Sequence, residues 1–397
     1  DLKVPDGVET IKSFAFYGCS ELESIYIPRS VKQIGNNVFT NCTNVKSLII
    51  EGGLDDIICG YDNYISYSTG KACFFDCPLE QLYLGRNITY NAEQNYGYSP
   101  FYNKTTLTSL EIGDSVTCLN KNLFSKCTNI ESVTIPKSIK KIEIGVFDGC
   151  TALSKINIQD LSSWCNITFG FRSNPLNIAK HLYLNNELLT HVVIPKDVKE
   201  IKEYSFSGCT SIKTIELHDS IVRIGDDAFS RCSSLTDINI PNSVTDINGA
   251  AFYECTKLSS IKLGEGLVNI VSNAFFGCTS LRKVINFSNL NIIAGSEEFG
   301  YVAKYADVVV SQNDERVDDF FFRSKDNDNV LIAYIGHEKT VTPPSNYKNQ
   351  NYRIGKSAFA SCSELYSISI PTCVTSIDDY AFSNCYSLKK VTIETGD

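Results

Sequence analysis

Residues 235–255 read LTDINIPNSVTDINGAAFYEC and contain every feature that recurs along this chain. An alternating apolar run is followed by a V-x-x-I motif, and the segment ends in A-F-x-x-C. Such cysteines recur every 23 residues, as at Cys209, Cys232, Cys255 and Cys278. Self-similarity at a fixed period of about 20–29 residues is typical of a solenoid, in which each turn buries its apolar face against its neighbours.

One repeat predicts a fixed series of short elements. Ile261 and Leu263 alternate with Lys262, the pattern of a strand with one buried face. The V-x-x-I motif predicts a brief second strand, and residues 225–229 predict a single helical or 3₁₀ turn capped by an aspartate. We therefore expect a right-handed leucine-rich-repeat superhelix, mostly of short β-strands, with about 23 residues per coil.

The 397 residues are expected to form a single solenoid domain, because a solenoid grows by adding coils. Irregular insertions are expected near 51–100, 161–187 and 288–351, where the period breaks. Within the last insertion, two apolar runs at 319–323 and 330–335 flank a polar segment, which predicts a β-hairpin.

A phenylalanine lies three residues before each regularly placed cysteine. Stacking the coils would align these rings as a buried aromatic spine, in which each ring contributes about 1.5–3 kcal/mol. The predicted structural spine consists of Phe16, Phe39, Phe74, Phe124, Phe147, Phe206, Phe229, Phe252, Phe275, Phe359 and Phe382.

Eleven of the sixteen cysteines occupy the repeated position. Equivalent side chains in consecutive coils lie about 4.8 Å apart, beyond the Cβ separation of a relaxed disulfide. We therefore expect buried, reduced thiols that bond weakly to the loop backbone. This reduced cysteine ladder consists of Cys19, Cys42, Cys77, Cys127, Cys150, Cys209, Cys232, Cys255, Cys278, Cys362 and Cys385.

The other five cysteines are less determined by the pattern. A disulfide between Cys59 and Cys73 is one alternative for two of them, and the redox states of Cys118, Cys165 and Cys373 are open.

Two coils carry another residue at the cysteine position. Asn174 follows Phe171 by three residues, and its amide is expected to bond the backbone of adjacent loops. Lys104 follows Phe101 in the same way, and its ammonium is expected to point outward.

Charge and motifs exclude several functions. The net charge of −9, with acidic and basic residues interspersed, argues against nucleic acid or an anionic membrane as the main partner. No apolar run is long enough to insert into a membrane. None of His181, His191, His218 and His337 lies in a hydrolase or metalloprotease motif. We expect no enzyme activity, no catalytic or metal site and no cofactor.

Binding of a partner is the function that remains after these exclusions. The outward residues of the strand ladder offer the broadest surface for it. Tyrosine is enriched at interfaces, although it is also simply a favourable residue on an exposed sheet. The candidate partner-binding face consists of Tyr26, Tyr83, Glu111, Thr134, Asn157, Tyr183, Glu216, Asn239 and Lys262.

Tyrosine-rich loops in the first insertion form a second candidate surface, because insertions in solenoids often serve the binding face. Their tyrosines are Tyr61, Tyr64, Tyr67, Tyr90, Tyr96 and Tyr98.

The unit I-x-I-P-x-x-V-x-x-I-G-x-x-A-F-x-x-C-x-x-L resembles the BspA-like, Treponema-type leucine-rich repeats of bacterial surface proteins. Irregular segments such as Trp164-Cys165-Asn166-Ile167 and Tyr334-Ile335-Gly336 also look like segments of such proteins from gut Bacteroidales. The resemblance covers nearly the whole chain. It implies a cell-surface or extracellular protein that binds a protein, or a glycan, of a host or neighbouring cell, and it brings no catalytic residues.

The sequence begins at the end of one repeat strand and stops just after another. We expect a piece of a longer protein whose export signal and anchor lie outside it. Two functions compete: a binding module, or a structural spacer that presents another domain. An aromatic or like-charged patch spanning several coils would favour binding, whereas an enzyme would need a pocket where acidic, histidine or cysteine side chains converge.

Overall fold

The computed structural model describes residues 1–60, 72–91, 99–326 and 328–395. They divide into two compact units, the first made of Asp1–Thr190 and Ile201–Ser211 and the second of His191–Glu200 and Ile212–Asp397. Each unit contains coils of short strands that repeat about every 23 residues, which confirms the predicted β-solenoid class. A single uninterrupted domain stays a prediction.

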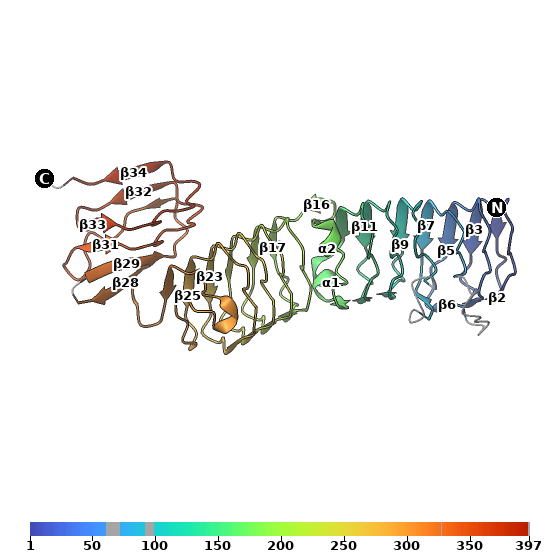
Figure 1. Cartoon of the computed structure of the whole chain (residues 1–397), viewed down its shortest axis with the longest axis horizontal. Helices are drawn as coiled ribbons and strands as arrows, with labels where there is room; N and C mark the ends of the chain where they lie inside the picture. Colours follow the sequence, from blue (N-terminus) through green and yellow to red (C-terminus); the bar gives the residue numbers. More distant parts are fainter. Residues whose placement is uncertain (61–71, 92–98, 327, 396–397) are drawn as a thin grey trace. The chain divides into compact units, whose positions relative to one another are not determined.

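The first unit contains a ladder of parallel strands with exact repeat register. Tyr26 aligns with Ile49, 23 residues later, so equivalent residues of successive coils form rows across the sheet. Figure 1 shows these strands side by side. One sheet contains β1 (Leu2–Lys3), β3 (Ser24–Ile27), β5 (Ser47–Ile50), β7 (Gln81–Leu84) and β9 (Ser109–Ile112). The next contains β11 (Ser132–Ile135), β13 (Lys155–Ile158), β15 (Leu182–Leu184) and the antiparallel β16 (Glu187–Leu188).

The V-x-x-I motifs of the first unit form short strands in separate sheets, as the sequence predicts. In Figure 1, β2 and β6 lie at the opposite edge of the coils from β3 and β5. The short strands are β2 (Thr10–Ile11), β4 (Gln33–Ile34), β6 (Ile57–Cys59), β8 (Ile88–Thr89), β10 (Cys118–Leu119), β12 (Lys141–Ile142) and β14 (Thr168–Phe169).

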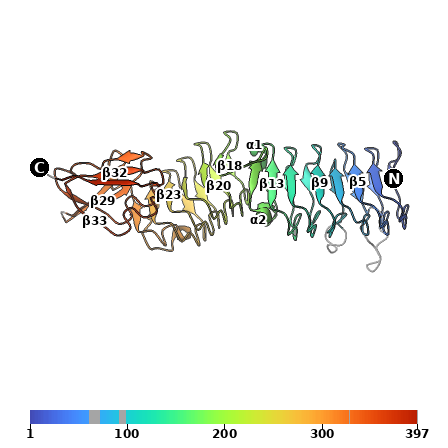
Figure 2. The same ribbon diagram turned by 90° about the horizontal axis from the view of Figure 1, so that it is seen from above.

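The insertion at 161–187 contains two short helices, α1 (Leu161–Cys165) and α2 (Leu176–Ala179), which Figure 2 shows next to β13. Asp160 caps α1 because its carboxylate accepts a hydrogen bond from the Ser163 backbone N–H. The Trp164 ring is buried, and its Nε1 donates to Ser205 O at 3.0 Å. No helix in the described residues has the length and apolar character needed to cross a bilayer.

The second unit begins with a similar ladder. Asn239 aligns with Lys262, and Lys262 aligns with Ile285. The main sheet contains β17 (His191–Val193), β19 (Thr214–Glu216), β21 (Asp237–Asn239), β23 (Ser260–Leu263), β25 (Lys283–Asn286) and β26 (Val308–Val310). The short strands are β18 (Glu200–Ile201), β20 (Arg223–Ile224), β22 (Asp246–Ile247) and β24 (Asn269–Ile270), and η2 (Phe299–Tyr301) is a 3₁₀ helix.

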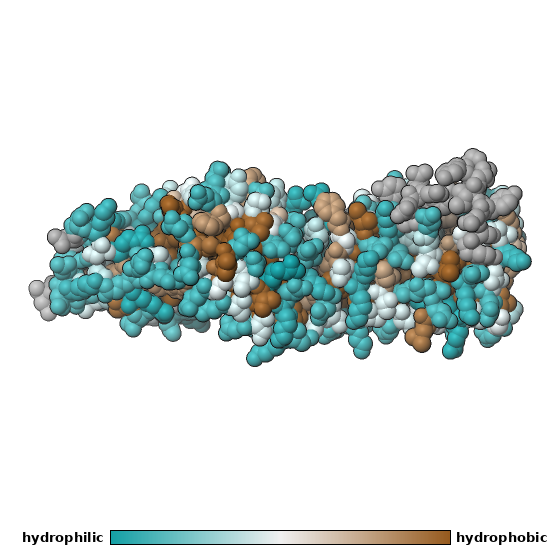
Figure 3. All heavy atoms as spheres, turned by 90° about the horizontal axis from the view of Figure 1, so that it is seen from below, coloured by the Kyte–Doolittle hydropathy of each residue, from teal (hydrophilic) through white to brown (hydrophobic). Residues whose placement is uncertain are grey.

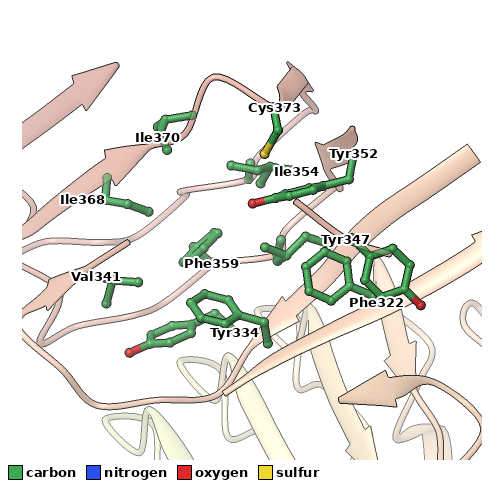
Figure 4. Packing of buried hydrophobic residues seen from close by; sticks show 14 of the residues in the cluster. Phe322, Tyr334, Val341, Tyr347, Tyr352, Ile354, Phe359, Ile368, Ile370 and Cys373 are labelled. Atoms are coloured by element: carbon green, nitrogen blue, oxygen red, sulfur yellow. The ribbon is translucent and has the colours of Figure 1, made fainter. Parts of the chain in front are cut away.

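The C-terminal part of the second unit contains the predicted hairpin, because β28 (Phe320–Lys325) and β29 (Asp328–Tyr334) pair in antiparallel fashion. Aromatic rings pack beneath it, and Figure 4 shows Phe322 facing Tyr347 with 4.3 Å between ring centroids. The other strands are β27 (Glu315–Val317), β30 (Thr340–Val341), β31 (Tyr352–Ile354), β32 (Ser367–Ile370), β33 (Val374–Ile377) and β34 (Lys390–Ile393).

The segment at 225–229 forms consecutive turns where a single helical or 3₁₀ turn was expected. Asp227 has a left-handed backbone, with φ of 51°, which interrupts a helical run. The carboxylate of Asp226 instead accepts from Gly249 N at 2.9 Å, in the following coil. The aspartate therefore ties two coils together.

Candidate functional site

The phenylalanine rings stack from coil to coil. The centroids of Phe16 and Phe39 are 5.4 Å apart, and those of Phe252 and Phe275 are 5.0 Å apart with nearly parallel planes. Phe101 continues the row between Phe74 and Phe124. This row fixes which side chains of each coil remain on the outside.

The thiols form a second internal row. Cys255 Sγ donates to Phe229 O and Cys278 Sγ donates to Phe252 O, each at 3.1 Å, so a thiol binds the spine carbonyl of the preceding coil. All sixteen cysteines are free thiols, including Cys59 and Cys73. Burial raises the pKa of Cys278 to about 12, so this thiol stays protonated at neutral pH.

The prediction for Lys104 is wrong, because its side chain points inward and is only 4% exposed. Its ammonium donates to Phe74 O, to Phe75 O at 2.7 Å and to Cys77 O at 3.0 Å. Burial lowers the pKa of Lys104. Three converging carbonyls thus hold an ammonium where other coils hold a thiol.

The Asn174 amide donates to Tyr204 O and Ser205 O, in agreement with the expected bonds to loop backbone. Phe171, three residues earlier, does not enter the spine and is 60% exposed. The interior of this coil is filled instead by Trp164 and Phe169, whose rings meet edge to face at 5.2 Å.

Tyr26, Ile49 and Tyr83 form a continuous outward row on β3, β5 and β7. The Lys3 ammonium lies 5.4 Å from the Tyr26 ring centroid. Partial burial and the neighbouring Glu51 carboxylate raise the pKa of the Tyr26 hydroxyl. The Tyr83 hydroxyl lies over Gly113, where a Cβ would approach it to 2.8 Å, so the glycine makes room for the tyrosine.

Glu111 continues this row on β9, since it aligns with Tyr83, and its side chain is exposed, as is that of Thr134 on β11. Asn157 corrects the prediction, because it is buried. Its carbonyl oxygen accepts from Asn186 N at 2.8 Å, so the β15–β16 turn covers it.

Tyr183 lies at the end of this part of the face. The Lys155 ammonium is 4.7 Å from its ring centroid. Tyr183 aligns with Leu188 of the antiparallel β16, which occupies the next position in the sheet.

In the second unit, Glu216 and Asn239 are exposed and Lys262 is partly buried. Glu216 lies 3.2 Å from His191 Nε2, and His191 Nδ1 is 2.6 Å from Thr214 Oγ1. His191 is therefore an exposed histidine with ordinary sheet partners.

A pocket of about 250 Å³ lies over the strand face of the second unit. Its lining includes Asp237, Lys262, Lys283, His337 and Cys362. Such a convergence could not be expected from the sequence, because the lining comes from segments more than a hundred residues apart. One signal was present in the sequence: His337 follows Tyr334 by three residues, the spacing of the spine phenylalanines and their cysteines.

Most of the tyrosine-rich loop candidates, namely Tyr61, Tyr64, Tyr67, Tyr96 and Tyr98, lie outside the described residues. Tyr90 is described, and its hydroxyl donates to Lys121 O at 2.7 Å. Burial raises the pKa of Tyr90. This tyrosine therefore has a structural contact within the coil.

The family model described as the BspA type leucine rich repeat region matches residues 1–60, 67–174, 176–325 and 340–396. No curated protein matches the chain significantly.

Several solved structures are similar to it. A leucine-rich repeat protein from Bacteroides ovatus is 22% identical, covering 77% of this chain and 87% of that chain, with a TM-score of 0.40. The pneumococcal vaccine antigen PcpA is 18% identical over 98% and 85% of the two chains, with a TM-score of 0.42. A leucine rich repeat protein of T. pallidum is 26% identical over 48% and 74%, with a TM-score of 0.27.

Proposed function

Because this chain belongs to the BspA type leucine rich repeat family, we propose that it is a non-enzymatic binding module of the cell surface or extracellular space. Its ligand is a protein of a host or neighbouring cell, held on the exposed strand face of the first unit. The row of Tyr26, Ile49 and Tyr83 is the observation that carries this proposal.

This row combines aromatic and apolar side chains, as the centre of a protein interface commonly does. Tyr26 and Tyr83 are partly exposed, and Ile49 between them is exposed. Ser24 and Ser47, two positions earlier on the same strands, are small, so the larger side chains stand above their neighbours. Clustered aromatic residues commonly contribute most of the binding free energy of an interface.

The two tyrosines are also held in place before a partner arrives. Tyr26 contacts Lys3 and Glu51, and Tyr83 lies over Gly113. Side chains that are already ordered lose less conformational entropy on binding, which favours affinity.

Figure 3 shows the molecule from below, where apolar side chains form small groups separated by polar ones. The competing function is a spacer that only presents another domain. A spacer would need no partner contact through the tyrosine row.

The test is capture of partners from host mucosal extract by the chain, compared with a variant carrying Tyr26→Ser, Tyr83→Ser and Tyr183→Ser. A matched control carries Tyr17→Ser, Tyr366→Ser and Tyr386→Ser, which removes three exposed tyrosines away from that row. For any captured protein, we expect at least a roughly tenfold loss of affinity in the face variant only. Equal affinity in both variants would reject this face, and the absence of any saturable partner would favour the spacer.

A further inference from the structure

The cysteine ladder of the second unit is interrupted between Cys278 and Cys362. Tyr334 occupies the spine, since its ring stacks on Phe359 at 5.3 Å and its N–H donates to Ala358 O. His337 therefore stands where the regular coils carry cysteine. The next coil returns to the regular pattern with Phe359 and Cys362.

This interruption changes the surroundings of Cys362. In most regular coils the thiol donates to the spine carbonyl of the preceding coil, as Cys385 does to Phe359 O at 3.0 Å. The equivalent acceptor for Cys362 is Tyr334 O, but Lys283 Nζ binds that oxygen at 3.1 Å. Cys362 is only partly buried and lines the 250 Å³ pocket.

Lys283 supplies a second, independent indication of a ligand. Its side chain is 5% exposed, lines the same pocket and, within the described part of the chain, forms no ion pair with a carboxylate. A buried ammonium whose recorded partner is one carbonyl retains donors for an anionic group. Lys262 lines the pocket nearby.

The opposite charge is also present. Asp237, Glu338 and Glu364 line the pocket together with the two lysines and His337. A ligand that carries both a carboxylate and an ammonium would complement this mixed lining better than a purely anionic or purely cationic one. The volume is below the roughly 300–1,000 Å³ of ordinary drug-sized sites, so the ligand is small.

The pKa of this thiol also shifts in the direction opposite to that of a regular coil. The side-chain contact with Cys385, followed by the charges of Lys283 and His337, lowers the pKa of Cys362. Burial instead raises the pKa of Cys255, which occupies the same position in a regular coil. Since the thiolate is the nucleophile, the direction of these two shifts and the access from the pocket both favour attack by Cys362 over attack by Cys255.

We propose that this pocket captures small amino-acid disulfides through thiol–disulfide exchange at Cys362. Lys283 and Lys262 bind the ligand carboxylate, and the acidic residues bind its ammonium. The Cys362 thiolate attacks one sulfur of the external disulfide, so that a new S–S bond forms and the external S–S bond breaks. The second half leaves as a thiolate and takes up a proton; Cys362 is oxidised and the leaving half is reduced.

The product remains a mixed disulfide. Cys385 is the nearest thiol that could displace the bound half, but the hydrogen-bonded contact with Cys362 raises its pKa, which keeps it protonated. Neighbouring rungs of a parallel ladder are also about 4.8 Å apart, wider than the Cβ separation of a relaxed disulfide.

The experiment exposes the intact reduced chain to three probes that share the disulfide and differ in charge. Cystine carries both charges, 3,3′-dithiodipropionate only carboxylates, and cystamine only ammonium groups. Intact mass and peptide mapping follow the rate and site of modification. We expect one addition, at Cys362, with cystine reacting about tenfold faster than cystamine. Equal rates for the two, or addition spread over several cysteines, would overturn the proposal.

Two variants complete the test. Lys283→Met, which keeps a long unbranched side chain but removes the ammonium, is expected to remove the preference for cystine over cystamine. Cys362→Ser is expected to abolish the addition, whereas Cys255→Ser leaves it unchanged. If circular dichroism shows that Lys283→Met is unfolded, the comparison of the three probes on the unmodified chain tests the proposed charge preference by itself.

Discussion

The two units each contain a coil in which the repeated cysteine is replaced, and the outcomes are opposite. In the first unit, Lys104 reaches inward and binds three carbonyls, so the coil stays closed. In the second, His337 stands at the cysteine position, and the carbonyl of Tyr334 in the same coil is bound by Lys283 from another strand and not by Cys362 of the next coil. The position of the repeated cysteine therefore requires a side chain that donates hydrogen bonds to backbone carbonyls, and the donor need not be a thiol.

The regular coils show the same requirement. The thiols of Cys255, Cys278 and Cys385 each donate to a backbone oxygen of the spine residue in the preceding coil. Lys104 satisfies those oxygens from within the row, whereas the oxygen of Tyr334 is bound from a distant strand beside the pocket.

The largest effect is expected in a fully regular coil. Phe252→Ala should lower the free energy of unfolding by about 3–5 kcal/mol, because it leaves a cavity between Phe229 and Phe275. Denaturant titration measures the change. Phe276→Ala, which removes an exposed ring in a neighbouring coil, is the control and should cost far less. Equal losses in both variants would show that the spine is not internal.

Lys104→Ala should lower the free energy of unfolding by about 2–3 kcal/mol, since it leaves buried carbonyls without a donor. Lys104→Cys should recover part of this loss, because it restores the residue that the other coils carry. Both are measured by denaturant titration. If Lys104→Cys is no more stable than Lys104→Ala, the closed coil depends on the ammonium itself and not on a donor at that position.

Alkaline pH should lower the free energy of unfolding through the buried thiols of the cysteine ladder. The folded pKa of Cys278 is about 12, above an unfolded value of about 8.5, so its contribution is complete below pH 8.5 and is lost as pH rises toward 12. Between pH 8 and pH 10, the free energy of unfolding should fall by about 2 kcal/mol less in Cys278→Ala than in the original chain. Parallel pH profiles would mean that this thiol titrates freely.

The smallest effect is expected on the strand face beside the pocket. Lys262→Ala should change the free energy of unfolding by less than about 0.5 kcal/mol, because the side chain is only partly buried and its one described ring contact is with Phe287. A loss above about 1 kcal/mol in denaturant titration would show that Lys262 supports the wall of the pocket.

The sequence period predicted the parts of this molecule that repeat. Strand register, the short second strands and the 319–335 hairpin follow from alternation and spacing, because each is decided within one coil or between neighbouring coils. Tyr26 and Tyr83 could be placed in one outward row on the same grounds.

Departures from the period could not be predicted in the same way. The direction of Lys104 depends on three carbonyls from another coil, and the burial of Asn157 depends on a turn about 29 residues away. Phe171 is displaced because Trp164 and Phe169 fill the interior. The pocket combines β21–β25 with residues 334–338 and 361–365, which no local pattern relates.

The register of the coils has a consequence for changes in chain length. Because Cys232 and Cys255 occupy equivalent positions 23 residues apart, removing residues 233–255 would join two matching coils without shifting any ring or thiol out of its row. Removing part of a strand or of an F-x-x-C segment would instead break the rows in that coil. Loops can differ in length without this effect, since Ser47 pairs with Gln81 more than one 23-residue period later, but a longer loop adds no rung. Duplication and deletion of entire coils is therefore the route by which the length of the ladder can change.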